Sequence, residues 1–164
     1  MSAAQSGIVA SPAAPGVAAV ADEVFVTLCV AGQLCGLPVR SVRDVLEPQG
    51  ITRIPLAFPE IAGSLNLRGK IVTAISLRHR LGLPPAGAPA SCMSIVTEQG
   101  AELYALLVDQ VLDVLTLPAA GLERVPPTLP PAWRRLGAGV HRLPDGLLVI
   151  LDLDRVLDLA PLEA

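Results

Sequence analysis

Residues 63–71 are the nearest approach in this chain to a phosphate-binding loop. They read Gly-Ser-Leu-Asn-Leu-Arg-Gly-Lys-Ile, so Arg68 and Lys70 would supply positive charge beside two glycines. A P-loop needs four residues between its glycines and a serine or threonine after the lysine to hold magnesium. Five residues separate Gly63 from Gly69, and an isoleucine follows Lys70, so the match fails.

Asp152 and Asp154 are two residues apart, and in a strand they would share one face as a catalytic carboxylate pair does. They follow an apolar run and precede residues with helical spacing. Aspartate at such a junction commonly caps the free N–H groups of a helix. We therefore favour capping, and we keep acid–base chemistry as the alternative.

The three cysteines, Cys29, Cys35 and Cys92, are an odd number without a CxxC motif. No histidine stands at the spacing of a zinc ligand relative to them. We therefore expect reduced, packed thiols in a cytosolic protein and no metal site.

Arg78 and Arg80 flank His79, and His141 stands apart from them in the second half of the chain. We interpret both histidines as solvated or hydrogen-bonded surface residues. The two arginines are interpreted as a solvated basic face, with a partner contact as the alternative. No set of residues qualifies as catalytic, so we expect a protein without enzyme activity or cofactor.

The composition argues against a nucleic-acid groove, which needs a concentrated positive field and stacking platforms. The chain has 12 Lys and Arg against 15 Asp and Glu, a net charge of −3, and 2% aromatic residues. Glycine and proline make up 30 of the 164 residues, which favours many turns between short strands. Residues 1–21 carry no charge and contain Pro12 and Pro15, so we expect a disordered tail rather than an export signal. No later apolar run is long enough to span a membrane.

Turn residues and apolar runs predict a series of β-hairpins. Hairpins are expected over 24–37, 64–77 and 140–151, the last around an Asp145-Gly146 turn, with further strands at 93–97 and 102–108. Two segments show helical spacing instead. Val39, Val42, Val45 and Leu46 fall three to four residues apart and predict a helical turn, and residues 153–159 predict a short closing helix.

An internal repeat is the most informative pattern in the chain. The paired segments are 37–46 with 106–115, and 54–55 with 125–126. The repeat predicts two small barrels with pseudo-twofold symmetry, in subdomains 22–88 and 89–160 of one domain that spans 22–160. Each half is too small to be stable alone, so we expect a shared core and no folding of the separated halves.

Four blocks of the chain resemble the signatures of CheW-like domains. Residues 61–72, Ile-Ala-Gly-Ser-Leu-Asn-Leu-Arg-Gly-Lys-Ile-Val, are similar to the family pattern xxGxxNLRGxIxPVxxLR. Residues 36–45 are similar to GIPVxxVxEV, residues 105–111 to GLLVDxV, and residues 146–153 to GxLVxLLDLD. The blocks stand in the family's order and at its distances, and the resemblance covers residues 23 to 160.

This resemblance implies an all-β fold of two intertwined five-stranded SH3-like barrels, with a few short helical turns and a short C-terminal helix. It implies a non-enzymatic adaptor of bacterial chemotaxis signalling. In the family, the cytoplasmic tip of a methyl-accepting chemoreceptor lies in a groove between the barrels. The regulatory domain of the histidine kinase CheA packs on the barrel ends. The implied protein is cytoplasmic and associated with membrane-bound receptor arrays, without inserting into the membrane itself.

The family motifs place the receptor-side positions at Val42, Asp44, Gly63, Asn66 and Arg68. This chain departs from the family at three places near them. The usual glutamate is Asp44, which is one methylene shorter, and the common Pro and Asp after the hairpin are Thr73 and Ser76.

Two other functions remain as alternatives. The same fold could serve a chemosensory system for surface motility or another output, with different receptors. A small nucleotide-handling enzyme would instead use Arg68, Lys70 and the pair Asp152 and Asp154.

Overall fold

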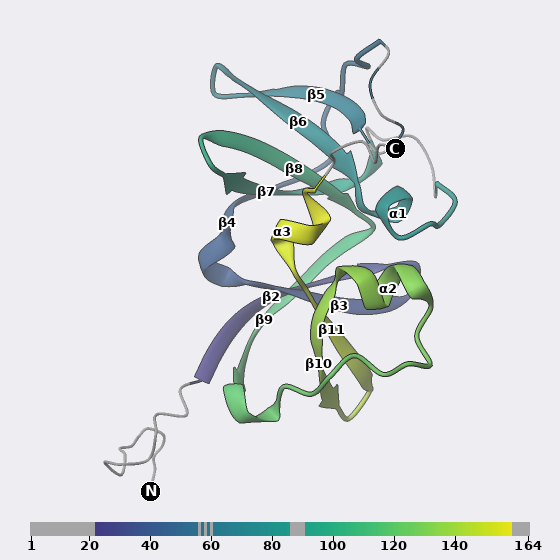
Figure 1. Cartoon of the computed structure of the whole chain (residues 1–164). Coiled ribbons are helices and arrows are strands. Elements are labelled where there is room, and N and C mark those ends of the chain that lie inside the picture. Colours follow the sequence, from purple (N-terminus) through teal and green to yellow (C-terminus); the bar gives the residue numbers. More distant parts are fainter. Residues whose placement is uncertain (1–21, 56, 58, 60, 86–90, 159–164) are drawn as a thin grey trace, which may run out of the picture.

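The computed structural model describes residues 22–55, 57, 59, 61–85 and 91–158. Across these residues the chain forms two five-stranded sheets, one above the other in the view of Figure 1, with three short α-helices. The expected tail (1–21) and the expected end of the domain at residue 160 lie outside the described residues.

The lower sheet of Figure 1 has the strand order β10-β11-β3-β2-β9. Its strands are β2 (Asp22–Val30), β3 (Gln33–Pro38), β9 (Gln110–Pro118), β10 (Gly137–Leu143) and β11 (Gly146–Leu151). The β2–β3 hairpin turns at Ala31 and Gly32, whose φ angles are 53° and 81°. Two residues at positive φ match the right-handed twist of the flanking strands. The third predicted hairpin turns one residue earlier than expected, because Gly146 pairs with Leu143 and already belongs to β11.

The upper sheet has the strand order β4-β7-β8-β6-β5. Its strands are β4 (Val42–Leu46), β5 (Ile61–Leu67), β6 (Lys70–Ser76), β7 (Met93–Gln99) and β8 (Glu102–Val108). Each sheet therefore contains strands from both 22–88 and 89–160. The predicted all-β fold of two intertwined barrels is confirmed, and the failure of the separated halves to fold stays a prediction.

Each sheet is closed into a barrel by one isolated β-bridge beyond its edge strand. In the upper barrel, Thr52 pairs with Ser64 of β5 through two backbone hydrogen bonds of 2.8 Å. In the lower barrel, Glu123 pairs with Val140 of β10 through two bonds of the same length. The two closures lie at corresponding positions of the repeat and express its pseudo-twofold symmetry.

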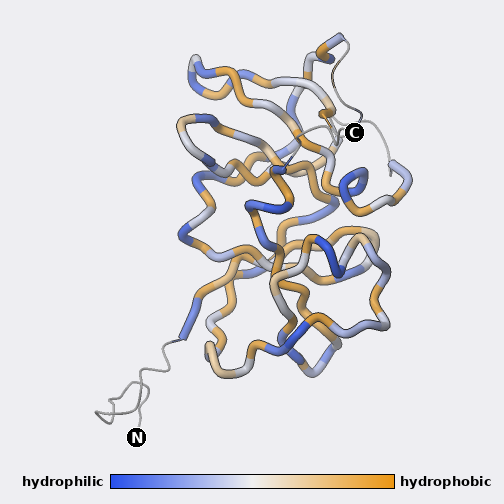
Figure 2. Tube along the Cα trace, viewed as in Figure 1, coloured by the Kyte–Doolittle hydropathy of each residue, from blue (hydrophilic) through white to orange (hydrophobic). Residues whose placement is uncertain are grey.

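Hydrophobic side chains of both barrels form a common core. This shared core includes Leu28 and Leu37 of the lower sheet and Ile95 and Leu106 of the upper sheet, all of them fully buried. Each barrel also has a small core of its own, around Val72 in the upper barrel and Phe25 in the lower. Figure 2 shows the hydrophobic segments along the strands and hydrophilic ones at α1 (Leu77–Arg80) and α3 (Leu153–Val156).

The helical turn expected over Val39–Leu46 is wrong for most of its length. Only Val39–Ser41 is a 3₁₀ turn, called η1, and Val42–Leu46 is strand β4. The corresponding repeat segment is likewise a strand, β9. Both segments are rich in β-branched valine and pair with a neighbouring strand, β7 or β2, so tertiary pairing overrides the helical spacing.

The short helices are set by local caps. The Ser76 hydroxyl accepts a hydrogen bond from the backbone N–H of His79 and caps α1, so serine here takes a role that aspartate also fills. Asp152 caps α3 by accepting from the N–H of Arg155, which confirms the capping interpretation. Helix α3 ends at Val156, before the expected residue 159, and α2 (Pro131–Leu136) is a helix that the pattern did not predict.

The basic face expected at Arg78 and Arg80 is wrong, because both side chains bind the protein itself. Arg78 donates from Nε to Asp109 Oδ1 at 2.9 Å and from Nη2 to Oδ2 at 2.7 Å, and both side chains are about four-fifths buried. Asp109 Oδ2 also accepts from the N–H of Ala31, so this pair joins α1 of the upper barrel to the β2–β3 turn of the lower. Arg80 donates to two carbonyl oxygens at α3.

Two further side chains bear on the sequence expectations. His141 is buried, against our expectation of a surface residue, and its ring lies 5.7 Å from that of Phe25 beneath the lower sheet. Its place on β10 turns it inward, which its isolation in the sequence did not reveal. Cys29, Cys35 and Cys92 form no disulfide within the described residues, and burial raises the pKa of Cys35. Among the described residues, no helix is long and apolar enough to cross a membrane.

Candidate docking surface

The edge strands β4 and β9 carry a β-bulge at corresponding positions of the repeat. In β4, Val42 pairs with Thr97 and Asp44 with Val96, so Arg43 is the extra residue. In β9, Val111 pairs with Leu28 and Val114 with Val26, so Leu112 and Asp113 together oppose Thr27. A bulge shifts the alternation of side chains by one position and re-aims the residues beyond it.

With the two bulges, four valines of the edge strands lie on the face toward the shared core, one before and one after each bulge. Val42 and Val111 pack against it. Val45 lies opposite Ile95, and Val114 lies opposite Val26, and both partners belong to that core. Val45 is 39% exposed and Val114 is 60% exposed. We call the four residues Val42, Val45, Val111 and Val114 the seam, because they lie on two edge strands that flank the junction of the barrels.

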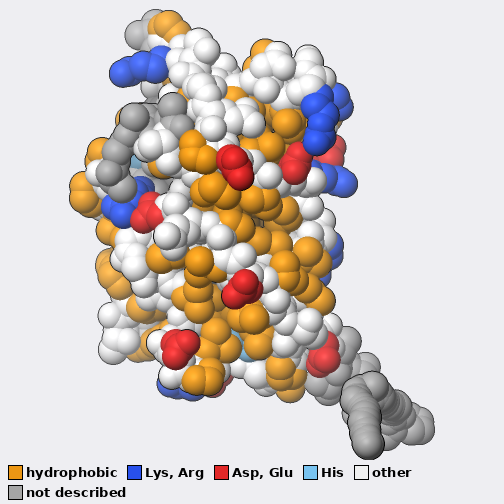
Figure 3. Space-filling model, turned by 180° about the vertical axis from the view of Figure 1, so that it is seen from behind, with side chains coloured by type: hydrophobic (Ala, Val, Ile, Leu, Met, Phe, Trp, Pro, Cys, Tyr) orange, Lys and Arg blue, Asp and Glu red, His pale blue; other side chains and the backbone are white. Residues whose placement is uncertain are grey.

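The surface around this junction is strongly hydrophobic. Figure 3 shows hydrophobic side chains gathered in a band along the middle of the face opposite to that of Figure 1. Isolated acidic side chains interrupt the band, and cationic side chains lie at its margins. Exposed apolar surface of this kind is typical of sites that contact another macromolecule.

An ion pair stands beside the seam on the upper barrel. Arg68 Nη2 lies 3.2 Å from Asp44 Oδ2, and the Arg68 side chain is 79% exposed against 28% for Asp44. Asp44 Oδ1 also accepts from the N–H of Val45, so the carboxylate is held at the bulge. An exposed pair adds little to stability. The guanidinium therefore offers a planar fork of donors to an incoming carboxylate or carbonyl.

Asn66 and Gly69 shape the hairpin that carries Arg68. The β5–β6 loop is Arg68-Gly69, with φ angles of 52° and 86°, and Leu67 pairs with Lys70 across it. Asn66 Oδ1 accepts from the N–H of Gly69 at 2.9 Å. This bond holds a turn in which a non-glycine residue, Arg68, has positive φ. Arg68 thus lies at an exposed hairpin tip, as the sequence suggested.

Gly63 serves the closure of the upper barrel. Its φ is 150°, and a Cβ atom there would lie 2.3 Å from the backbone oxygen of Thr52. A side chain at Gly63 would push the 51–52 segment away from β5. The structure therefore joins Asp44 with Arg68, sets Val42 and Asn66 on the neighbouring backbone, and puts Gly63 at the barrel closure. The receptor-side positions taken from the motifs did not include Val45 and Val114, although the repeat relates these two valines to each other.

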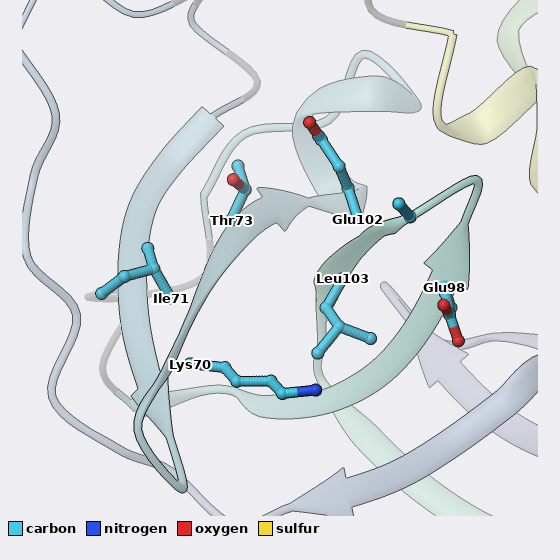
Figure 4. A pocket seen from close by; sticks show the side chains of 7 residues that line it. Lys70, Ile71, Thr73, Glu98, Glu102 and Leu103 are labelled. Atoms are coloured by element: carbon cyan, nitrogen blue, oxygen red, sulfur yellow. The ribbon is translucent and has the colours of Figure 1, made fainter.

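A hollow of about 400 Å³ opens at the end of the upper barrel (Figure 4). It lies where β6 and β8 diverge beyond their first paired residues, Thr73 and Tyr104. Ile71, at its rim, is 70% exposed. The complete lining is Lys70, Ile71, Thr73, Glu98, Ala101, Glu102 and Leu103.

The charged groups of the hollow are engaged with neighbouring side chains. Glu98 pairs with Arg43 at 2.8 Å, and Glu102 accepts from the hydroxyl of Tyr104 at 3.0 Å. Burial raises the pKa of Tyr104, and its hydrogen bond to Glu102 adds to this, so the phenol stays a neutral donor. The hollow thus has mainly polar walls, with one cation, Lys70, and two carboxylates, and the exposed Ile71 lies at its rim.

The residues of the nucleotide-enzyme alternative are not assembled into one site. Arg68 pairs with Asp44, Asp152 caps α3, and Asp154 accepts from the side chain of Gln99 at 3.1 Å. Lys70 lines the hollow with two carboxylates, which oppose a phosphate electrostatically. Within the described residues, no group of three or more His, Cys, Asp or Glu side chains could hold a metal ion.

Two closed barrels with a shared core and an exposed apolar seam define a binding scaffold. Comparison with known families agrees, since the model of the CheW-like domain matches residues 24–160. The chain belongs to the CheW-like domain family.

Individual relatives cover most of the chain. It is 28% identical over 136 residues to the chemotaxis protein CheW of Bacillus subtilis, covering 83% of this chain and 87% of that protein. It is 23% identical over 133 residues to the chemotaxis protein CheW of Helicobacter pylori, covering 81% and 80%. The crystal structure of the scaffolding protein TtCheW from Thermoanaerobacter tengcongensis matches with a TM-score of 0.75 at 28% identity, covering 84% and 94%. These relatives support a chemotaxis scaffold.

Proposed function

We propose that this protein is a non-enzymatic adaptor that couples methyl-accepting chemoreceptors to the histidine kinase CheA. The observation that carries the proposal is the exposed apolar seam between two barrels, with the Asp44–Arg68 pair at its side. An adaptor needs two separate contact surfaces and no catalytic group. The seam and the hollow at the end of the upper barrel supply two such surfaces.

The cytoplasmic tip of a receptor, a helical hairpin, docks on the seam. Apolar residues of the tip cover Val45 and Val114, which are exposed in the free protein. Arg68 then binds a carboxylate or a carbonyl oxygen of the tip, and Asp44 holds the guanidinium toward it. Val42 completes the apolar contact, while Asn66 and Gly63 support it through the hairpin and the barrel closure. Receptor binding would place the protein at membrane-bound receptor arrays.

The regulatory domain of CheA packs on the end of the upper barrel. Ile71 is the most exposed large hydrophobic side chain among the described residues, and it lines the hollow together with Leu103. An apolar anchor in a hollow with polar walls is typical of a central interface residue. The seam and this barrel end present different chemistry, so both partners can bind one copy of the protein.

Two binding titrations test the proposal, one with a soluble receptor fragment that carries the cytoplasmic tip and one with the isolated CheA regulatory domain. We expect saturable binding to both. Arg68→Glu should weaken receptor binding at least about tenfold, since truncation of a central interface arginine commonly costs about 2 kcal/mol. Ile71→Asp should weaken CheA binding and leave receptor binding unchanged.

The matched control for the charge reversal is Arg142→Glu. Arg142 is also an exposed arginine paired with a carboxylate, Glu123, but on the lower barrel. It should change neither affinity. Absence of binding to either partner, or equal losses from Arg68→Glu and Arg142→Glu, contradicts the proposal. A parallel titration with ATP addresses the enzyme alternative, which saturable binding would favour.

A further inference from the structure

The bulge of β9 is held by a side chain of the neighbouring strand. Thr27 of β2 is 2% exposed, and its hydroxyl donates to the carbonyl oxygen of Asp113 at 2.7 Å. The same hydroxyl accepts from the N–H of Asp113 at 2.9 Å. Both backbone groups of the bulged residue are therefore satisfied by one buried hydroxyl, where a regular ladder would have supplied backbone partners.

This bulge decides which side chain β9 presents to the junction of the barrels. Val111 faces the shared core through its pairing with Leu28. Regular alternation beyond Val111 would put Asp113 on the same face and turn Val114 away from it. With the extra residue, Val114 pairs with Val26 and lies on that face. The bulge therefore exchanges a carboxylate for an apolar side chain at the seam.

The corresponding position of the upper barrel lacks this hydroxyl. Asp44 of β4 pairs with Val96, a buried core residue without polar side-chain atoms. There the Asp44 carboxylate itself accepts from the N–H of Val45. The threonine clamp is thus particular to β9, where the apolar seam residue is the more exposed of the two.

We propose that Thr27 is a positioning residue for partner docking, because its hydroxyl fixes the β9 bulge that presents Val114 at the seam. The inference rests on the proposed function, with the receptor tip as the partner. Thr27 itself is buried and does not touch the partner. Loss of its hydroxyl lets β9 shift toward regular pairing, which draws Asp113 toward the apolar face and repels an apolar tip.

The experiment measures affinity for the receptor-tip fragment and hydrogen exchange at the Asp113 amide in four variants. Thr27→Val keeps the shape and removes both hydrogen bonds of the hydroxyl, and it should weaken receptor binding about fivefold. Its Asp113 amide should exchange faster. Thr27→Ser keeps the hydroxyl and should bind within about twofold of the wild-type protein. Val114→Lys tests the seam directly and should bind at least about tenfold more weakly.

Thr97→Val is the matched control. Thr97 is fully buried on β7, and its hydroxyl has no hydrogen-bond partner among the described residues. The same chemical change there should leave receptor affinity and the Asp113 amide unchanged.

The outcomes separate the two proposals. Unchanged binding in Val114→Lys contradicts the seam as the receptor site and thus the proposed function. Weak binding in Val114→Lys together with wild-type affinity in folded Thr27→Val overturns the role of Thr27 alone. If Thr27→Val does not fold, hydrogen exchange at the Asp113 amide of the wild-type protein tests the role of Thr27 instead. Protection of that amide supports the clamp, and exchange at the rate of an unstructured peptide overturns it.

Discussion

The edge strands β4 and β9 have the same sequence pattern and the same bulged backbone, yet they present different chemistry. Both read Val-x-Asp-Val-Leu. On β4, the variable residue is Arg43, paired with Glu98, and the aspartate is paired with Arg68. On β9, the variable residue is Leu112, which is 44% exposed, and the bulge is held through the backbone by Thr27.

The repeat has thus preserved a shape twice while the side chains have diverged. The upper edge carries ion pairs, which give direction and specificity to a contact. The lower edge carries apolar surface, which gives area to bury. A partner that spans both edges meets a charged margin on one side and an apolar one on the other, so it can dock in only one orientation.

The largest expected effect lies at the barrel closures, where the two halves use equivalent glycines. Gly63→Ala should lower the free energy of unfolding by about 3 kcal/mol, because it combines positive φ with a backbone clash at Thr52. Gly139→Ala should cost about 1–2 kcal/mol, because a Cβ there meets the Glu123 oxygen at 2.7 Å without positive φ.

Urea denaturation measures both free energies, with Gly50→Ala as the control. A Cβ at Gly50 has nothing within 4 Å, so the change should stay within about 0.5 kcal/mol. Equal losses at Gly63 and Gly139 would show that close approach sets the cost at both closures and that the positive φ of Gly63 adds nothing to it.

The next effect concerns an equivalent pair of residues that precede the two edge strands. The repeat aligns Asp109 with Arg40. Asp109→Ala should lower the free energy of unfolding by about 2–3 kcal/mol, because it leaves the largely buried Arg78 and the N–H of Ala31 without their hydrogen-bond acceptor. Arg40→Ala should cost less than about 0.5 kcal/mol, because the Arg40 side chain is 74% exposed in its pair with Glu23. Thermal and urea unfolding compare the two, and similar losses would contradict the assignment of Asp109 as the tie between the barrels.

The smallest expected effect is a pH dependence of stability that arises from Asp109. The hydrogen bonds from Arg78 hold the pKa of Asp109 below its ordinary value, although burial opposes them. Because the pKa is lower in the folded state, the stabilisation is complete above the unfolded-state value of about 4 and is lost as pH falls through the folded-state value. Unfolding followed between pH 7 and 3 should therefore show a steeper acid loss in the wild-type protein than in Asp109→Asn. Parallel curves of stability against pH for the two proteins would show that Asp109 does not contribute to the loss of stability in acid.

Much of the fold followed from local pattern. The hairpins at 24–37 and 64–77 were predictable because their turns contain glycine and the strands beside them are strongly apolar. The exposed tip at Arg68 followed from the same hairpin. The bulges were not predictable, since they depend on which strand lies opposite, and that strand is up to about ninety residues away in sequence.

Only part of the candidate site was predicted from the sequence. Asp44 and Arg68 were named from the family motif, and the structure joins them in an ion pair. Val45 and Val114 were missed, because a valine in an edge strand looks like a core residue until its pairing is known. The buried His141 and the Arg78–Asp109 tie were missed for the same reason, since each depends on elements distant in sequence.

The sequence by itself determined the repeat, the β-rich class, the turns of the first two hairpins and the family, because these rest on local propensity and on motifs within short segments. Only the tertiary structure decided that 42–46 and 110–118 are bulged edge strands and that Val114 reaches the surface at the junction of the barrels. The physical reason is that helical spacing and strand pairing of these valine-rich segments differ little in local free energy. Burial against β2 and β7 settles the choice.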